Sequence, residues 1–237
     1  MSHYPFRRLQ SELAEMINSL PAETRLPSEP SLAKQMGVSR ATLREAMRSF
    51  EGKGMLRRRQ GVGTFVAAKV PVMETGLEVL ESIGTIAKRS GLTVRMGELQ
   101  IQKIAADEEL AEMLNLEEKA ELTRVARIIY TDNRPIAYLV DTLPVDILPS
   151  DELQSGFTGS VLDLLLSRGV PKLIQSRTEI KAMGASSEVA RALQIQRDDV
   201  LLHFAAQLYA EESRVVDYSI SYFLPGYFRF HVVRRVG

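Results

Sequence analysis

The sequence predicts an α+β protein of two domains, a small helical domain followed by a larger domain built on an antiparallel sheet. Its 237 residues suit a small domain plus a medium one. Apolar residues recur at helical spacing near the N-terminus, whereas strand-like runs separated by turn residues dominate after residue 95. Charge divides in the same way, because residues 1–69 hold 12 Lys and Arg against 6 Asp and Glu, and the remainder holds 18 against 24. The basic first third predicts a domain that meets nucleic acid.

Composition excludes several classes of protein. The chain has no cysteine, which excludes disulfides and thiolate metal sites. Its histidines, His3, His203 and His231, form no metal-binding spacing with an acid. There is no phosphate-binding glycine loop and no nucleophile motif, so we predict no cofactor, no metal and no catalytic residue. No apolar run reaches the roughly 18 to 20 residues that span a bilayer, and the start lacks a secretory signal, which predicts a cytoplasmic protein without a membrane partner.

Three short helices are predicted near the N-terminus. Residues 6–20 carry a helical stripe of leucine, methionine and isoleucine, and Pro21 ends this helix. Ser28 is placed to cap a second helix, with Gly37 suited to its left-handed C-terminal turn, and Ser39 caps a third. Two short helices joined by this tight turn form a helix-turn-helix, whose second helix lies in the DNA major groove.

The third helix carries more arginine than its packing requires. Arg40 and Arg44 lie near its N-terminal end, where either can bind guanine through two hydrogen bonds worth about 1 to 3 kcal/mol of base discrimination. The Ser39 and Thr42 hydroxyls, with the helix amides, suit phosphate oxygens. The alternative is a solvated helix face with a capping serine, although like charges four residues apart slightly destabilise an isolated helix. The arrangement favours DNA recognition.

A hairpin is predicted after the third helix. Residues 55–67 contain two short extended runs around a GVG turn, a pattern typical of a β-hairpin. The three arginines at 57–59 would place positive charge beside the helix and against the DNA backbone or minor groove. A basic run is also typical of a plain solvated surface, but this one adjoins the helix-turn-helix. We therefore predict a wing.

The GntR family of bacterial transcription regulators has a winged helix-turn-helix that resembles residues 26–66, LPSEPSLAKQMGVSRATLREAMRSFEGKGMLRRRQGVGTFV. The resemblance implies DNA contacts from the third helix and from the wing. Relatives usually carry an arginine after LPSE, where this chain has Pro30, so one phosphate or base contact is missing there. Together with the basic run, the resemblance gives seven predicted DNA-binding residues: Ser39, Arg40, Thr42, Arg44, Arg58, Gln60 and Gly61.

The larger domain is predicted to follow a linker. Residues 69–76 carry Pro71 and Gly76, which are typical of a linker, and a helix is expected over residues 77–91. Hairpin turns within the later strands imply antiparallel pairing. The remaining predicted elements are helices at 107–115, 159–169 and 186–194, and strands at 97–106, 123–143, 178–185, 201–223 and 228–235.

An internal repeat supports this layout. Residues 106–138 align with residues 185–217 after a shift of 79 positions. Each copy would be a helix, a loop and a hairpin, and two copies can pair into one sheet with pseudo-twofold symmetry. The cleft between such copies suits a small ligand. Either an ancestral duplication or similar packing needs in two separate units would produce the repeat.

The UTRA domain, found in the HutC branch of the GntR family, resembles residues 91–235. The matching features are Arg127, eight residues before the hairpin proline, the helix start at Ser160, and the strand VVDYSISYF followed by FRF. The resemblance implies a chorismate-lyase-like fold that binds a small effector. Many relatives have a second arginine where this chain has Ile129, which argues against strong recognition of a phosphorylated sugar.

Five residues are predicted to bind the effector. Arg127 lies in an apolar strand and is costly to bury without an anionic partner. Ser160 would cap a helix whose N-terminal amides favour an anionic ligand group, or would serve as a cap alone. Asp217 and Ser219 share one face of a strand that either meets solvent or lines a polar pocket. Arg177 would act as Arg127 does, or would pair with the glutamate two residues later.

The complete prediction is a ligand-responsive transcription regulator, a repressor that a small effector releases from a pseudo-palindromic operator in double-stranded DNA. We expect a homodimer, because a helix-turn-helix dimer reads two half-sites, and an anionic effector is one option. The predicted domains are a winged helix-turn-helix at 1–68, a linker and connecting helix at 69–90, and a UTRA-like effector-binding and dimerisation domain at 91–237. Two alternatives stay open: a regulator whose second domain is purely structural, and a chorismate-lyase-like enzyme with Asp217 as its acid.

Overall fold

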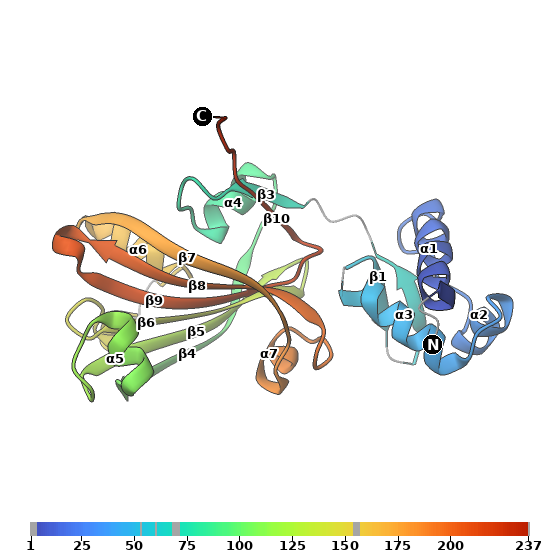
Figure 1. The fold of residues 1–237 in the computed structure, drawn as a ribbon, viewed down its shortest axis with the longest axis horizontal. Helices are drawn as coiled ribbons and strands as arrows, with labels where there is room; N and C mark the ends of the chain where they lie inside the picture. Colours follow the sequence, from blue (N-terminus) through green and yellow to red (C-terminus); the bar gives the residue numbers. More distant parts are fainter. Residues whose placement is uncertain (1–3, 53, 60, 68–71, 154–156, 237) are drawn as a thin grey trace. The chain divides into compact units, whose positions relative to one another are not determined.

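The structure is a computed structural model that describes five stretches of the chain: residues 4–52, 54–59, 61–67, 72–153 and 157–236. The chain divides into two compact units (Figure 1). Unit 1 comprises Met1–Val72 with Leu224–Phe228, and unit 2 comprises Met73–Phe223 with Arg229–Gly237. Both helices and antiparallel strands are present, which confirms the α+β class. Among the described helices, none combines the length and the apolarity that a membrane crossing requires.

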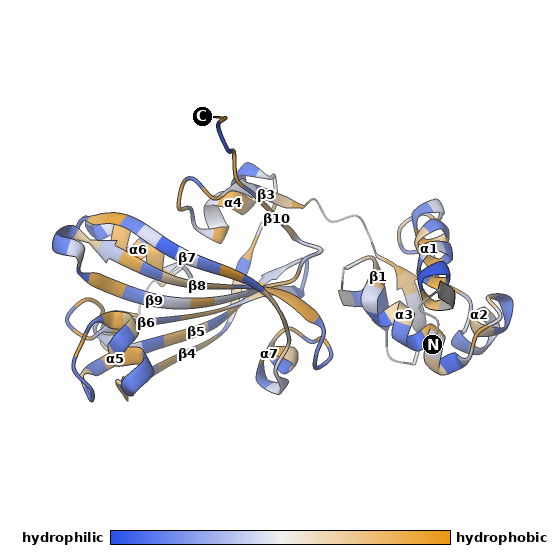
Figure 2. Ribbon diagram, in the orientation of Figure 1, coloured by the Kyte–Doolittle hydropathy of each residue, from blue (hydrophilic) through white to orange (hydrophobic). Residues whose placement is uncertain are grey.

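Unit 1 contains the three predicted helices and the predicted hairpin. Each helix contributes a leucine with no exposed surface to one shared core, and hydrophobic and hydrophilic residues alternate along α1 and α3 (Figure 2). Ser28 caps α2 through the Ser31 N–H, as predicted, and Pro30 stands in the first turn, where a missing N–H has no helical partner to lose. The elements are α1 Tyr4–Ser19, α2 Glu29–Gln35, α3 Arg40–Gly52, β1 Leu56–Arg59 and β2 Gly63–Val66.

Unit 2 is built on a six-stranded sheet with the order β4-β5-β6-β9-β8-β7, in which every neighbouring pair is antiparallel. Helix α6 packs on one face, here called the α6 face, and α5 and α7 lie on the other (Figure 1). The elements are β4 Arg95–Ala105, α5 Glu108–Leu114, β5 Glu121–Thr131, β6 Arg134–Pro144, η1 Ser150–Leu153, α6 Val161–Arg168, β7 Leu173–Gly184, α7 Ser187–Ala192, β8 Val200–Ala210, η2 Glu211–Ser213 and β9 Val215–Phe223.

The 79-residue repeat is visible in the fold. Strands β5 and β8 begin and end 79 residues apart, and α5 and α7 begin 79 residues apart. Even the loop backbone repeats, because the left-handed residues Asn115 and Lys119 recur as Gln194 and Asp198 with nearly the same φ. The two copies, β4-β5-β6 and β7-β8-β9, meet at the β6–β9 pair in the middle of the sheet. The predicted pseudo-twofold sheet is therefore confirmed.

The segment predicted as a linker forms a strand over part of its length. Of residues 69–76, Met73–Gly76 is strand β3, which pairs with β10, Phe228–His231, in a separate two-stranded sheet. The last predicted strand, at 228–235, is therefore shorter than expected and lies outside the main sheet. Pro71, on which the linker prediction rested, lies outside the described residues.

The helix predicted over residues 77–91 is also shorter than expected. Helix α4 spans only Ile83–Arg89, because Ser82 caps it by accepting the Thr85 N–H at 3.1 Å. The earlier apolar residues Leu77 and Leu80 are 41% and 48% exposed, so no core holds them in a helix. Helical spacing was misleading here because only the later part of the stripe, Ile86 and Ala87, is buried.

Candidate DNA interface and effector site

The N-terminus of α3 is exposed and capped. The Ser39 Oγ accepts the Thr42 backbone N–H at 3.1 Å and lies 2.8 Å from the Thr42 hydroxyl. Arg40 and Arg44 are exposed, whereas Leu43 between them is fully buried in the core of unit 1. The buried leucine fixes the helix, and the side chains that can reach base edges project from its surface.

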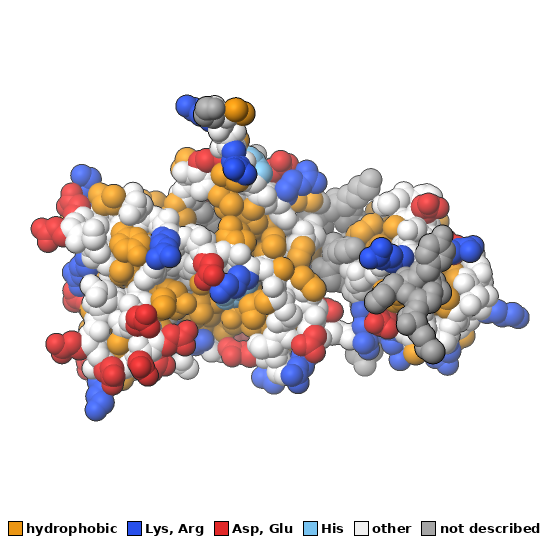
Figure 3. Space-filling model, in the orientation of Figure 1, with side chains coloured by type: hydrophobic (Ala, Val, Ile, Leu, Met, Phe, Trp, Pro, Cys, Tyr) orange, Lys and Arg blue, Asp and Glu red, His pale blue; other side chains and the backbone are white. Residues whose placement is uncertain are grey.

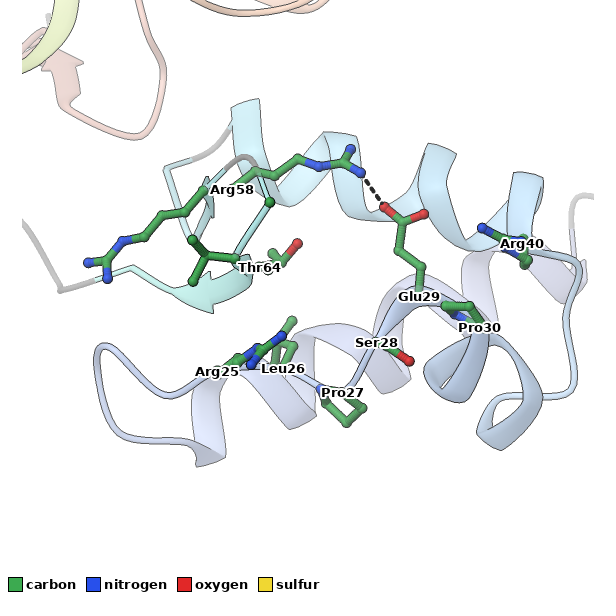
Figure 4. A pocket seen from close by; sticks show the side chains of 13 residues that line it. Arg25, Leu26, Pro27, Ser28, Glu29, Pro30, Arg40, Arg58 and Thr64 are labelled. Carbon is green, nitrogen blue, oxygen red and sulfur yellow. Dashed lines mark hydrogen bonds and ion pairs between the residues drawn. The ribbon is translucent and has the colours of Figure 1, made fainter.

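Glu29, at the start of α2, connects α3 to the wing. One carboxylate oxygen accepts a hydrogen bond from Arg44 Nη2 at 2.7 Å, and the other accepts one from Arg58 Nη2 at 2.7 Å (the Arg58 contact is drawn in Figure 4). The Arg44 hydrogen bond, followed by the nearby arginine charges, lowers the pKa of Glu29 below its ordinary value. Glu29 therefore stays ionised and holds both guanidinium groups in place.

Glu23 binds the other two arginines of the wing. Its Oε2 accepts hydrogen bonds from Arg59 Nη2, at 2.6 Å, and from Arg57 Nη2. The Arg59 guanidinium also lies over the Phe65 ring, 4.6 Å from its centroid. Exposed ion pairs contribute only about 0 to 1 kcal/mol to stability, so the main effect of these contacts is to orient the arginines.

A cleft of about 330 Å³ lies between the start of α2, the N-terminus of α3 and the wing (Figure 4). Four arginines line it, against the single acid Glu29. A cleft with this excess of positive charge suits the phosphates of a nucleic-acid strand. Its arginines are Arg25, Arg40, Arg58 and Arg59.

Charge is divided between the units. Figure 3 shows Lys and Arg side chains around the outline of unit 1, and acidic side chains gathered over the α5 end of unit 2. The first turn of α5 contributes Glu108 and Glu109. This distribution makes unit 1 the part of the chain that attracts a polyanion.

The structure places six of the seven predicted DNA-binding residues on one helix and one hairpin. Ser39, Thr42 and Arg44 lie in or beside the first turns of α3, while Arg40 and Arg58 line the cleft. Gly61 also lines the cleft and has a φ of 74°, which favours glycine. The remaining residue, Gln60, lies outside the described residues.

In unit 2, Arg127 of β5 is buried and has a carboxylate partner within the chain. Its Nη1 donates to Asp141 Oδ2 on β6, and its Nε donates to the carbonyl oxygen of Gly159, just before α6. Arg127 is 4% exposed and Asp141 is 7% exposed, so the ion pair is withdrawn from water. The predicted need for an anionic partner is correct, but the chain itself supplies that partner.

Asp217 of β9 lies in the same cluster. Burial is the main cause that raises its pKa well above the ordinary value, and the charge of Asp141 and a hydrogen bond with that residue add to the shift. Arg127 and the Thr142 N–H oppose it. Asp217 Oδ1 is buried and has no hydrogen-bond partner among the described residues. The cluster thus holds a carboxyl group that favours its protonated form and has one unused oxygen.

The other predicted effector residues fall into two groups. Ser219 pairs in register with Asp141 and lies on the α6 face, and Ser160 caps α6 by accepting the Asp163 N–H at 3.0 Å. Arg177 differs, because it is opposite Gln207 in register, one step out of phase with the residues of the α6 face, and therefore lies on the other side of the sheet. The structure does not bring Arg177 together with the other four. Nor does Arg177 pair with the glutamate two residues later, which binds Lys181.

The sequence matches two models of protein families, which cover separate parts of the chain. The model described as bacterial regulatory proteins, gntR family, matches residues 6–66, and the model described as the UTRA domain matches residues 89–229, more than half of the chain. The chain belongs to the GntR family. As a GntR protein with a UTRA domain, it is a DNA-binding transcription regulator with a domain of the effector-binding type.

Relatives span most of this GntR protein. The HTH-type transcriptional regulator Rv0792c of Mycobacterium tuberculosis is 30% identical over 231 residues, which cover 94% of this chain and 84% of the relative. The HTH-type transcriptional repressor NagR of Bacillus subtilis is 28% identical over 196 residues, covering 83% and 79%. The crystal structure of PhnF from Mycobacterium smegmatis, 22% identical, matches with a TM-score of 0.66 over 97% of this chain and 100% of PhnF, which shows a shared fold.

Sequence reasoning missed the acids of this GntR protein. Glu23 precedes α2 and Glu29 is its first residue, and neither was assigned a role from the sequence pattern, although each holds two arginines. Asp141 is the one acid of β6, and of the two arginines of β5, Arg124 and Arg127, only Arg127 is buried. Since the hairpin turn fixes the register, this pairing of opposite charges was a usable signal.

Proposed function

We propose that this GntR protein is a repressor that binds an operator through unit 1 and leaves it when a small effector binds unit 2. The observation that carries the proposal is the arginine-lined cleft beside the exposed N-terminus of α3, in one chain with a sheet that buries a charged cluster. Backbone contacts would supply affinity, and base contacts by Arg40 or Arg44 would supply sequence choice. NagR, a relative of this chain, is named as a repressor, which supports the direction of the response.

We infer that the active form is a homodimer. A helix-turn-helix dimer reads two half-sites whose centres lie about 34 to 36 Å apart, one turn of the double helix. Twofold symmetry of the protein then matches a pseudo-palindromic operator. Light scattering should report twice the chain mass of 26.5 kDa for the free protein, and that mass plus the mass of the duplex on an operator. A single chain on the operator would contradict the inference.

The proposed effector site is the buried cluster around Arg127 on the α6 face. An effector with hydrogen-bond donors would satisfy the unused Asp217 oxygen, and Ser219 beside Asp141 offers a further hydroxyl. An anionic effector group would have to displace Asp141 from Arg127, since the two are paired in the free protein. An anionic effector therefore stays a prediction, which requires that Asp141 leave Arg127.

Coupling between the two sites should be measurable as a change in operator affinity. Allosteric coupling is typically about 1 to 3 kcal/mol, which corresponds to a 5- to 150-fold change. The full chain should bind a duplex among fragments tiled across the genes beside its own, and one metabolite of a panel should weaken that binding. If the protein, shown to be folded, binds none of the fragments at low salt, the proposed function is wrong.

A second candidate is a regulator whose unit 2 is purely structural. The observation that favours it is the internal neutralisation of Arg127 by Asp141, which leaves no unpaired charge at that position. Thermal unfolding separates the two candidates, because an effector at 100 times its dissociation constant adds about 2.7 kcal/mol of stability. An operator-binding protein that no metabolite stabilises or releases would favour the structural role. Conversion of a bound ligand into a product would instead favour the lyase alternative with Asp217.

A further inference from the structure

Arg25 lies between α1 and α2, in a segment that the backbone ties to the wing. The Leu26 N–H donates to the Thr64 carbonyl oxygen at 2.8 Å, and the Val66 N–H donates to the Thr24 carbonyl oxygen at 2.8 Å. Arg25 itself forms an antiparallel bridge with Phe65. Leu26 is buried in the core of unit 1, whereas Arg25 next to it is exposed. The segment therefore acts as a third strand of the wing and presents Arg25 on its surface.

The Arg25 side chain lies against the backbone of Gly63 in β2. A Cβ at Gly63 would stand 2.8 Å from Arg25 Nε, so the arginine would have to shift, and 3.4 Å from its Nη2. The φ of Gly63, 138°, is also one that other residues rarely adopt. Glycine at this position thus permits the contact. Because the wing backbone supports the guanidinium, less side-chain freedom is lost when Arg25 binds a partner.

Ion pairing divides the four arginines of the cleft into two kinds. Arg58 and Arg59 are held by Glu29 and Glu23. Arg25 and Arg40 form no ion pair within the described stretches of the chain. In Figure 4, Arg25 and Arg40 lie on opposite sides of the view, with Glu29 between them. The uncompensated positive charge is therefore found at the two ends of the cleft.

We propose that Arg25 binds a backbone phosphate of DNA at the wing end of this cleft. Its planar guanidinium can give two parallel hydrogen bonds to phosphate oxygens, and no carboxylate competes for them in the free protein. Ser28 and Thr64, which also line the cleft, add hydroxyl groups that suit the same ligand. Pro30, which lies near Arg40 in Figure 4, offers a phosphate neither a charge nor an N–H. The proposal rests on the proposed DNA-binding function.

The test measures the salt dependence of binding, with the full chain and a duplex of random sequence. Each phosphate contact contributes about 0.9 to the magnitude of the slope of log affinity against log salt. We expect Arg25→Ala to reduce that magnitude by about 0.9 and Arg25→Lys to retain most of it. The matched control is Arg8→Ala, an exposed arginine of the same unit that is paired with Glu12 along α1. The control should keep the slope of the wild-type protein.

A second variant guards against a change in the wing itself. Arg25→Gln keeps much of the side chain over Gly63 but removes the charge, so it should lose the same part of the slope as Arg25→Ala. Suppose that Arg25→Ala and Arg25→Gln have the melting temperature and the salt-dependence slope of the wild type, while Arg44→Ala loses operator binding. Arg25 then contacts no phosphate, and only this proposal fails. If the wild-type protein binds no duplex, the proposed function fails with it.

Free phosphate is the other source of the same ligand chemistry. Inorganic phosphate and chloride at equal ionic strength should displace the duplex equally if the cleft takes a DNA strand. Stronger displacement by phosphate in the wild type, absent in Arg25→Ala, would assign the site to a free anion and overturn the DNA assignment.

Discussion

The arginines that we expect at the DNA surface are of two kinds in the free protein, those with a carboxylate partner and those without one. Arg44 and Arg58 share the carboxylate of Glu29, whereas Arg40 carries no such partner among the described residues. A phosphate or base that binds Arg44 must therefore compete with Glu29, while one that binds Arg40 has no described ion pair to break. Affinity measured for a single substitution will include this competition.

The first prediction concerns base recognition by Arg44. Arg44→Ala should weaken binding to the operator by about 1 to 3 kcal/mol and affect a random duplex much less, because a base contact carries sequence information and a phosphate contact does not. Competition titrations with the two duplexes measure both losses, and Arg8→Ala again serves as the control. Equal losses on the two duplexes would show that Arg44 binds only the backbone.

The second prediction concerns Asp217 and pH. The pKa of Asp217 is raised in the folded protein, chiefly by burial, whereas in the unfolded chain the pKa of an aspartate is about 3.9. The contribution of this group to stability is therefore complete below about pH 3.9 and is lost as the pH rises through the raised folded value. Asp217→Asn, which cannot ionise, should remove that loss. The melting temperature of the variant, minus that of the wild type, should increase between pH 4 and pH 7, and a flat difference would contradict the shift.

The sequence could reveal a buried base but not its partner. Arg127 stands out because arginine is rare in an apolar strand, and the structure confirms its burial. Its partner could be found only from the register of the hairpin. The register places Asp141 opposite Val125, which is the neighbour of Arg127 on the same face of the sheet. Arg177 was placed in the same site for the same reason, yet its strand position directs it to the other face. Residue type indicated which side chains were unusual, and only the register showed which of them meet.

At the scale of the element, the start of α3 combines two tasks in Ser39. The cap stabilises the helix, and the same hydroxyl is exposed where a phosphate would approach. Ser39→Ala should lower stability by about 0.5 to 2 kcal/mol, because the Thr42 N–H loses its acceptor. Ser39→Asp should keep the cap and the stability but weaken DNA binding about tenfold or more, because a negative charge then faces the backbone. Calorimetry and DNA titration measure the two effects. DNA binding of Ser39→Asp at the level of the wild type would place this cap away from the DNA.

Glu29 provides the next prediction, since it ties a helix to a hairpin. Glu29→Gln removes a negative charge beside the cleft, so binding to random DNA should become stronger. The same change releases Arg44 and Arg58, so the preference for operator over random duplex should fall by roughly 1 kcal/mol, about fivefold. The two effects have opposite signs, which sets this variant apart from a simple change in charge. A rise in both affinities with the preference unchanged would show that Glu29 does not position the arginines.

The elements predicted best are those that bury a complete stripe or face. The winged helix-turn-helix and the two repeated hairpins follow from apolar spacing, caps and turns, and their cores are fully buried. The segment around α4 was predicted less well, because its apolar residues before Ser82 have no core to enter. The pairing of β3 with β10 joins segments more than 150 residues apart, and no local pattern carries that information.

At the scale of the whole chain, a net charge of zero conceals two oppositely charged parts. The basic part coincides with the gntR match and the acidic part with the UTRA match, so only one of them attracts DNA electrostatically. Strand β3 is the first element of unit 2, and its partner β10 follows the last strand of the main sheet. A change in the sheet can therefore reach β3 along the chain from β4 through α4, and also from β9 through the pairing of β10 with β3.

The repeated architecture of the sheet has a consequence for stoichiometry. The position that corresponds to Arg127 in the second copy is Ala206, and Arg127 is the one arginine among the buried residues that the structure describes. The fold is duplicated but the polar residues are not. We therefore expect one effector site in each chain, at Arg127, and none at the equivalent position of the second copy, Ala206. Isothermal titration should reach saturation at one ligand per chain, two per dimer. A stoichiometry of two effectors per chain would mean that the second copy binds the effector without a buried guanidinium.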